Sequence, residues 1–355
     1  MTRPPLALLL TLIGVTAGCN SAPTRTFVSP RADVLLQAHT DTFYQVQDGR
    51  AWFKETTEGT KKASFWKRAE QIELELDAYE RTGNPQQLEM FANLYRGFVG
   101  ENGATWMENK YNDDIMWMVI ACARGYLLTG RPEYRDTAKA NFDLCYARAI
   151  SPDLSGGLWW TTDNQSKNSC VNGPAAIAAV LLSRAWAEPA YRAKAADLYR
   201  WERATLFDPK TGRVSDNLNR NGRKSDTAFT YNEGTFVGAA DLLDHPDDAL
   251  LAATYTMNHV CRNGLLPQYG ENDDSGGFNG VGVRWIARFM YERGQEAVLE
   301  PWLQKNAEAA WNARRATDNL SWCRWPDPTP EGRRSSFGCS SAVVLLQVVH
   351  PPAGK

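Results

Sequence analysis

Two aspartates, Asp113 and Asp114, stand side by side in the segment NKYNDDIMWM at residues 109–118. Consecutive Cα atoms are about 3.8 Å apart. Side chains that diverge at the start of a helix can therefore place two carboxyl groups ~5–5.5 Å apart, as retaining glycosidases require. In that chemistry one carboxylate attacks the anomeric carbon, and the other group, protonated, donates to the departing oxygen. The wider spacing of an inverting glycosidase is harder to reach from neighbouring residues.

A purely structural role competes with this chemistry. Asn112 can act as the N-cap of a helix whose first turn holds both aspartates, because the helix dipole favours negative charge there. The residues that follow, Ile115 to Cys122, are apolar on every side, which is typical of a helix in an inner layer. Carboxyl groups at the mouth of such a helix are poorly solvated and repel each other, so one pKa rises and the other group stays ionised. The sequence therefore favours an acid beside a nucleophile.

Helical periodicity dominates the chain after residue 30. Within residues 64–82, for example, apolar side chains recur every three or four positions until Gly83 ends the pattern. The same pattern predicts twelve helices, near residues 31–47, 64–82, 86–99, 112–129, 132–149, 173–186, 189–206, 231–243, 246–262, 277–293, 295–313 and 336–349. The predicted fold class is therefore all-α.

The loops between these helices alternate between short polar turns and long segments rich in Gly, Asn and Trp. This alternation indicates a toroid of helical hairpins, in which the long loops gather at one end and form a cleft. No linker or change in composition interrupts residues 31–349, so we expect a single catalytic domain there.

The first 19 residues have the features of an export signal: an early positive charge, an apolar run over residues 6–15, and small residues that end at Cys19. The apolar run is too short to span a membrane as a helix. Residues 16–19, TAGC, resemble the bacterial lipobox, in which the cysteine is lipidated, although Thr16 departs from the usual Leu, Val or Ile. We expect an exported lipoprotein anchored at Cys19, on the periplasmic or cell-surface side of a bacterial membrane, with residues 20–30 as a tether.

Composition argues against several function classes. The formal net charge is −2 and basic residues are scattered, which argues against nucleic acid as a partner. No GxSxG motif, P-loop or GxGxxG context is present, which argues against a serine esterase and a nucleotide-binding protein. The four histidines are dispersed, which argues against a hydrolase that uses a catalytic histidine. Six cysteines follow Cys19, and Cys323 and Cys339, which bracket a Pro-rich segment, are the pair that the sequence favours for a disulfide. No cysteine has the spacing of a zinc site, and we expect no metal.

Four segments together resemble glycoside hydrolase family 76, the endo-α-1,6-mannanases and their relatives. They are YNDDIMW at 111–117, GGLWWTTDNQSKNSCVNGPAAIAAVLL at 156–182, FTYNEGTFVGAADLL at 229–243 and GGFNGVGVRWIARF at 276–289. The resemblance covers residues 40–349 and implies an (α/α)6 barrel, with retaining hydrolysis of α-1,6-mannan backbones and no cofactor. It also implies that Asp113 is the nucleophile and Asp114 the acid/base. The family often has Gln where this chain has Glu233 and Lys where it has Asn279, differences that concern substrate details rather than the reaction.

Five residues are candidates for substrate binding beside the carboxyl pair: Asn112, Trp160, Asn172, Tyr231 and Glu233. Trp160 lies in a long Gly-flanked loop, where it can stack on a sugar face; the alternative is a plug against the barrel. Asn172, Tyr231 and Glu233 lie near predicted helix starts, so helix capping is their alternative role. Glu233 is also the substitute carboxylate if Asp113 is not the nucleophile.

Two further charged features lie outside this set. The pair Asp273–Asp274 has Gly and Ser neighbours, which indicates a solvated loop, or at best a contact to calcium or substrate. Arg284 lies in an apolar helical stretch, where we expect it to pair with a buried carboxylate.

These observations predict a monomeric α-1,6-mannan hydrolase that cleaves bonds within the mannan chain. One alternative is a hydrolase or transglycosylase for another α-linked glycan, because retaining chemistry accepts either water or a sugar hydroxyl. The other is a surface glycan-binding lipoprotein without turnover. The crowded carboxyl pair argues against that second alternative, because a binding protein has no use for it.

Overall fold

The computed structural model describes residues 26–270 and 274–352. The predicted export signal, Cys19 and most of the predicted tether therefore lie outside the described residues. Within these two ranges, no helix is both long enough and apolar enough to cross a membrane.

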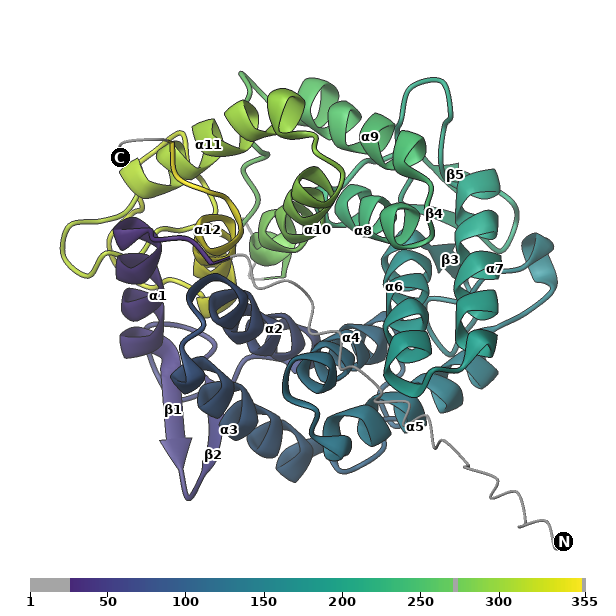
Figure 1. The fold of residues 1–355 in the computed structure, drawn as a ribbon, viewed down its shortest axis with the longest axis horizontal. Coiled ribbons are helices and arrows are strands. Elements are labelled where there is room, and N and C mark those ends of the chain that lie inside the picture. The colour runs from purple at the N-terminus through teal and green to yellow at the C-terminus, as the bar shows by residue number, and fades with distance from the viewer. Residues whose placement is uncertain (1–25, 271–273, 353–355) are drawn as a thin grey trace, which may run out of the picture.

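The described residues form two concentric rings of helices (Figure 1). In the inner ring, each even-numbered helix packs against the next, and α12 closes the ring against α2. The odd-numbered helices surround it, which is the predicted (α/α)6 barrel. The helices are α1 Pro30–Phe43, α2 Phe65–Thr82, α3 Pro85–Asn102, α4 Asn112–Thr129, α5 Pro132–Ala149, α6 Ser169–Trp186, α7 Pro189–Thr205, α8 Thr230–Leu242, α9 Pro246–Tyr255, α10 Phe278–Glu292, α11 Glu296–Asn312 and α12 Ser336–Val348.

Burial explains which helices form the inner ring. Almost every residue of α4 and α6 is buried, as their continuous apolar sequences require. The outer helices bury one face only: in α7, for example, Tyr191, Ala195 and Leu198 are buried, whereas Arg192, Ala193 and Asp197 between them are exposed.

The sequence interpretation missed five short strands. The helix predicted to reach residue 47 ends at Phe43, and β1 (Tyr44–Gln47) pairs with β2 (Arg50–Phe53). An Asp-Gly turn joins them, with both residues at positive φ, which is a strong hairpin signal that helical periodicity obscured. A second antiparallel sheet has the order β3 (Ser166–Asn168), β4 (Asn217–Asn219) and β5 (Lys224–Ser225).

Two helix boundaries also differ from the prediction. α6 begins at Ser169, four residues early, so Pro174 lies inside the helix and not in its first turn. α9 ends at Tyr255, and residues Thr256–Val260 form a π-helical turn in place of its predicted last part.

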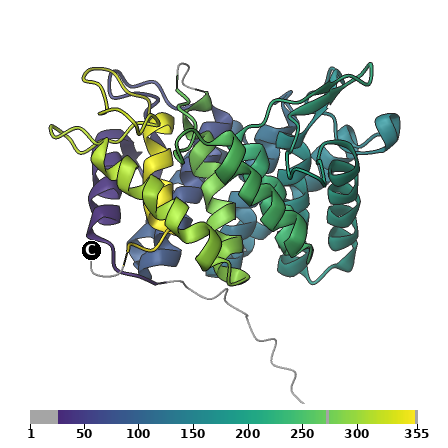
Figure 2. The same ribbon diagram turned by 90° about the horizontal axis from the view of Figure 1, so that it is seen from above.

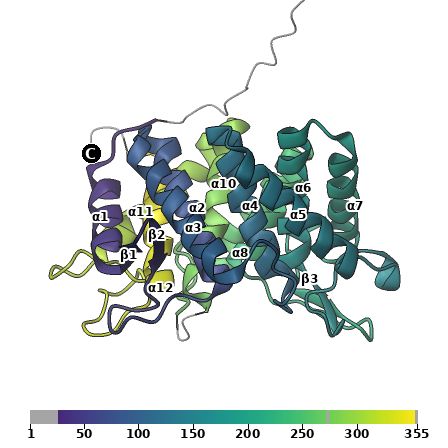
Figure 3. The same cartoon turned by 90° about the horizontal axis from the view of Figure 1, so that it is seen from below.

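Long connections gather at one end of the barrel, as predicted (Figures 2 and 3). Every inner helix is preceded by a long segment and followed by a turn of two or three residues, or by the C-terminal segment in the case of α12. The inner helices therefore run in the same direction, and their N-termini meet among the long connections. The first turn of α4, which holds Asp113 and Asp114, lies at this end.

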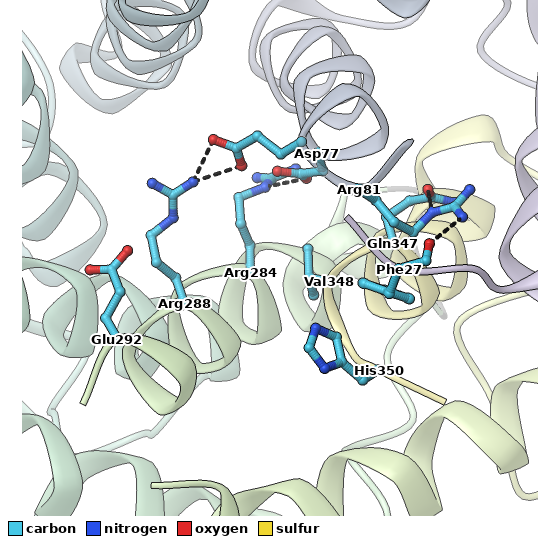
Figure 4. Close-up of a pocket in the computed structure, with 10 residues that line it drawn as sticks. Phe27, Asp77, Arg81, Arg284, Arg288, Glu292, Gln347, Val348 and His350 are labelled. Atoms are coloured by element: carbon cyan, nitrogen blue, oxygen red, sulfur yellow. Dashed lines mark hydrogen bonds and ion pairs between the residues drawn. The ribbon is translucent and has the colours of Figure 1, made fainter. Parts of the chain in front are cut away.

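Ion pairs fill the barrel near its other end. Arg124 of α4 contacts Glu73 at 2.7 Å and Asp77 at 2.9 Å, both from α2. Arg284 of α10 extends toward the same helix (Figure 4) and lies 2.6 Å from Asp77 and 2.5 Å from Glu70. The predicted pairing of Arg284 with a buried carboxylate is therefore confirmed.

The predicted disulfide between Cys323 and Cys339 is wrong for the described structure, in which no disulfide is formed. The thiol of Cys323 instead donates to the carbonyl oxygen of Tyr269 at 3.2 Å, in the connection before α10. Cys122 of α4 and Cys145 of α5 are buried free thiols.

We expect Arg124→Met to reduce the free energy of unfolding by about 3–5 kcal/mol, because it leaves buried carboxylates without one of their cations. Urea unfolding followed by circular dichroism measures the change. Arg200→Met is the matched control: Arg200 pairs with Asp197 on the surface, with side chains 70% and 59% exposed. Its loss should stay below about 1 kcal/mol. Similar losses in both variants would show that the buried cluster contributes no more than a surface pair.

Candidate active site

The carboxyl pair lies in the first turn of α4, as predicted, but the cap differs. Tyr111 is the N-cap residue and Asn112 is the first residue of the helix. Asp113 and Asp114 follow, and both line a cavity of about 560 Å³ among the long connections. Their position at the helix N-terminus places them where the helix dipole favours negative charge.

Aromatic side chains from several inner helices form much of the cavity wall. Trp66 comes from the first turn of α2, Trp117 from α4, Tyr231 from α8 and Phe278 from α10. The rings of Tyr231 and Phe278 stack, with centroids 4.0 Å apart. Such a wall suits the apolar faces of sugar rings. Polar groups complete the lining, among them Asn168, Cys170, Asp216, Asn217 and Asp274.

The two carboxyl groups have different surroundings. Burial raises the pKa of Asp113 to about 6, although the neighbouring Trp160 and Cys170 side chains oppose this rise. Burial and then the charge of Asp113 raise the pKa of Asp114 well above its usual range. Asn109 opposes that rise, since its amide donates to Asp114 Oδ2 at 2.8 Å. Burial therefore disfavours ionisation of both groups, and the charge of Asp113 further favours the protonated form of Asp114.

Two buried polar atoms of cavity-lining residues are left without a close hydrogen bond. Asp113 Oδ1 and Trp160 Nε1 are both buried, and neither has a hydrogen-bond partner among the described residues. Native structures rarely leave buried polar atoms unpaired without a functional reason. Trp160 nevertheless lies near enough to Asp113 to oppose the rise of its pKa, so both unpaired atoms belong to one part of the cavity wall.

Of the five predicted substrate-binding residues, the structure brings Trp160 and Tyr231 to the cavity. Trp160 lies beside Tyr111, with ring centroids 5.5 Å apart. Tyr231 faces the cavity together with Trp117, whose ring centroid is 6.5 Å away.

Asn112 and Asn172 are buried and do not line the cavity, so their predicted contact with substrate is wrong. The Asn112 amide donates to the Trp159 carbonyl oxygen at 2.8 Å. Asn172 Oδ1 accepts from the Leu158 backbone N–H at 2.8 Å. Both side chains therefore satisfy the backbone of the loop that carries Trp160, and they act on the site only by positioning it.

Glu233 is also buried outside the cavity, contrary to the prediction. Its Oε1 accepts from the Val214 backbone N–H at 2.9 Å, and burial raises its pKa well above the usual range. Positions two apart on an α-helix point about 200° apart, so Glu233 cannot share the cavity face that Tyr231 occupies.

Lys167 is a loop anchor that sequence reasoning missed. Its ammonium group donates to four backbone carbonyls, those of Ser151 at 3.0 Å, Asp153 at 2.6 Å, Gly156 at 2.6 Å and Gly157 at 3.0 Å. A buried cation thus holds together the loop that precedes Trp159 and Trp160. No local sequence pattern predicts this role, because lysine is usually a surface residue.

Asp274, Asp216 and Trp117 are cavity residues that sequence reasoning undervalued or missed. Asp274 is exposed, as expected of a solvated loop, and it also lines the cavity, where it accepts from Trp66 Nε1 at 2.9 Å; Asp273 lies outside the described residues. Asp216 accepts from Asn232 at 3.1 Å. Only the position of Trp117 could have been predicted from the sequence, because it follows Asp113 by four residues and so shares its helix face.

Residues 26–270 and 274–352 contain no group of three or more His, Cys, Asp or Glu placed to hold a metal ion.

Comparisons with known proteins agree with this geometry. The family model of glycosyl hydrolase family 76 matches residues 28–349. The α-1,6-mannanase GH76A of Salegentibacter sp. HEL1_6 is 30% identical, with 90% of this chain and 97% of that protein covered and a TM-score of 0.82. An inactive variant of that enzyme, with two consecutive aspartates replaced by asparagine, has been solved with α-1,6-mannotriose.

A family 76 glycoside hydrolase (mannosidase) of Bacteroides thetaiotaomicron shares the fold at 17% identity, with 89% of this chain and 96% of that protein covered and a TM-score of 0.76. No curated protein sequence shows significant similarity to the chain. The match of the family model over most of the chain, together with the double ring of helices, shows that the protein is a glycoside hydrolase and belongs to glycoside hydrolase family 76.

Proposed function

We propose that this protein hydrolyses α-1,6-linked mannan with retention of configuration, and that it cleaves within the chain. The observation that carries the proposal is the Asp113–Asp114 pair, which lines an aromatic cavity with two unequal pKa values. The Salegentibacter enzyme supports the substrate: it is an α-1,6-mannanase, and replacement of two consecutive aspartates accompanies its loss of activity.

In the first step, ionised Asp113 attacks the anomeric carbon of the mannosyl unit bound in the cavity. Asp114 transfers its proton to the glycosidic oxygen, so the C–O bond breaks and the remainder of the chain leaves with a hydroxyl group. The mannosyl unit is then an ester of Asp113, and Asp114 is a carboxylate.

In the second step, Asp114 takes a proton from water, whose oxygen attacks the same carbon from the opposite face. The ester bond breaks, Asp113 returns to its carboxylate form, and the sugar leaves with its original configuration. The two raised pKa values suit this cycle, because Asp114 must hold a proton in the first step and regain one in the second.

Cleavage within the glycan chain is supported by two grooves that lie beside the cavity. A groove of about 390 Å³ shares Asn217 with the cavity lining, and another of about 610 Å³ shares Phe229. Two grooves therefore adjoin the cavity, and an enzyme that cleaves within a glycan chain needs room for the polymer on both sides of the cleaved bond.

We also propose that the mature protein is a lipoprotein attached through Cys19, on the evidence of the lipobox-like segment TAGC. Cys19→Ser should move the protein from the membrane fraction of expressing bacteria to the soluble fraction. Immunoblotting of the two fractions measures this, and equal membrane retention of both forms would contradict the anchor.

Wild-type protein incubated with debranched α-1,6-mannan should release mixed short oligosaccharides early in the reaction, as chromatography of the products will show. Asp113→Asn should lower turnover roughly 10⁴-fold or more, because it removes the nucleophile. Asp114→Asn should lower it about 10²–10⁴-fold, and less for substrates with activated leaving groups, which do not need protonation.

Glu233→Gln is the matched control, because it alters a buried carboxyl group outside the cavity and keeps the oxygen that accepts from Val214. It should retain most activity. High activity in Asp113→Asn would rule out the assignment of the nucleophile, and release of only single mannose units would rule out cleavage within the chain.

The pH dependence of kcat/KM should be bell-shaped. Asp113 acts ionised, and its pKa is raised to about 6, so the rate should fall as the pH drops through about 6. Asp114 acts protonated and its pKa is raised by burial and by the charge of Asp113, so the rate should fall again as the pH rises through that pKa. Asn109→Ala removes a hydrogen bond that favours ionised Asp114. It should therefore move the alkaline limb of the profile to higher pH and leave the acid limb unchanged. A profile without an acid limb would contradict the assignment of Asp113.

A further inference from the structure

The hairpin formed by β4 and β5 carries a group of cations at the edge of the active site. Arg220, Arg223 and Lys224 are exposed, and none makes a side-chain hydrogen bond or ion pair with another described residue. The nearest carboxylate in sequence, Asp226, already lies 3.4 Å from Arg213 and accepts from the Ser215 hydroxyl at 3.1 Å. The hairpin therefore presents positive charge that no described carboxylate compensates.

This hairpin is held rigidly against the catalytic cavity. β4 pairs with β3, whose Ser166 and Asn168 line the cavity. The Arg220 backbone N–H donates to the Gln165 carbonyl oxygen at 2.8 Å. Asn219 Oδ1 closes the turn by accepting from the Arg223 backbone N–H at 2.9 Å. The positions of the cations relative to the carboxyl pair are thus set by the sheet.

Two of these cations, Arg223 and Lys224, border a groove of about 390 Å³ that lies beside the cavity. Its lining contains no aromatic ring, in contrast to the cavity itself, so it offers no surface on which a sugar ring stacks. It offers amides, a hydroxyl group and charges instead. The lining residues are Asn217, Asn219, Arg223, Lys224, Ser225 and Asp226, and Asn217 belongs to the cavity as well.

Protection of a sheet edge is the simplest competing role, because charged side chains on edge strands prevent pairing between molecules. It accounts for Lys224, which lies on the edge strand β5. It does not account for Arg220 and Arg223, which lie in the turn outside the strands. Arginine guanidinium groups are well suited to phosphate and carboxylate groups, which they bind through two parallel hydrogen bonds.

We infer that this groove, with Arg223 and Lys224 as its cations, binds an anionic substituent on the glycan chain that occupies the catalytic cavity, such as a phosphate ester. The inference rests on the proposed function, because it requires a polysaccharide that runs from the cavity past Asn217. It makes the protein selective for acidic mannan among polymers with the same backbone. Arg220, nearby on the same turn, adds to the positive field that attracts the substituent.

The test compares a mannan that carries phosphodiester-linked side groups with the same polymer after chemical removal of its phosphate. The wild-type kcat/KM should be several-fold higher on the phosphorylated polymer, and this preference should shrink as salt is added. In the double variant Arg223→Gln, Lys224→Gln the preference should fall roughly three- to tenfold, since two exposed ion pairs are lost. The readout is the ratio of kcat/KM on the two polymers, so a loss of activity common to both polymers does not count for or against the inference. Lys210→Gln, which alters an exposed lysine that lines neither groove nor cavity, should behave as wild type.

Equal wild-type rates on the two polymers, or a preference that survives in the double variant, would overturn the inference. So would binding to vesicles of anionic phospholipid that depends on Arg223 and Lys224, since it would assign the hairpin to a membrane surface. If neither polymer is cleaved, the proposed function fails instead. In that event, titration calorimetry with a phosphorylated α-1,6-mannotetraose and its phosphate-free counterpart still decides whether the groove recognises the anionic group.

Discussion

The common direction of the six inner helices is the constraint on which the site depends. Because every long connection precedes an inner helix, all six N-termini meet at one end of the barrel. The aromatic residues Trp66, Tyr231 and Phe278 lie in the first turns of three different helices and so converge on one cavity with the carboxyl pair. A pair of neighbouring aspartates is unfavourable in isolation, and the positive ends of the helices make it tolerable.

Burial has different outcomes for Glu80 in the ion-pair cluster and for the Asp113–Asp114 pair. Near the end opposite the carboxyl pair, burial acts against ionisation of Glu80, but Arg288 and Arg124 overcome it and lower the pKa to about 2. At the open end no arginine lines the cavity among the described residues, and burial raises the pKa of both Asp113 and Asp114. Paired carboxylates hold helices together, whereas unpaired ones stay available for proton transfer and attack.

Several buried polar residues near the site serve its loops and not the substrate. Asn112, Asn172 and Lys167 satisfy backbone groups of the segment that leads to Trp160. A long loop cannot be packed beside a cavity unless its carbonyl and N–H groups find partners. Residues of this kind look like substrate ligands in a sequence, because they are polar and close to a functional motif.

The sequence by itself determined the twelve helices, because the apolar period of an amphipathic helix is local and can be read from a few turns. It also determined that Asp113 and Asp114 begin a helix of the inner ring, since the residues after them are apolar on every side. Trp160 and Tyr231 followed from their places in a long loop and at a helix start. The tertiary structure decided the remainder of the site. Asp274 and Trp66 are 208 residues apart in the chain, and Asn217 meets the cavity only because β4 pairs with β3. The direction of a side chain such as Glu233, and the partners of Lys167, depend on contacts between segments far apart in sequence, which no local pattern contains.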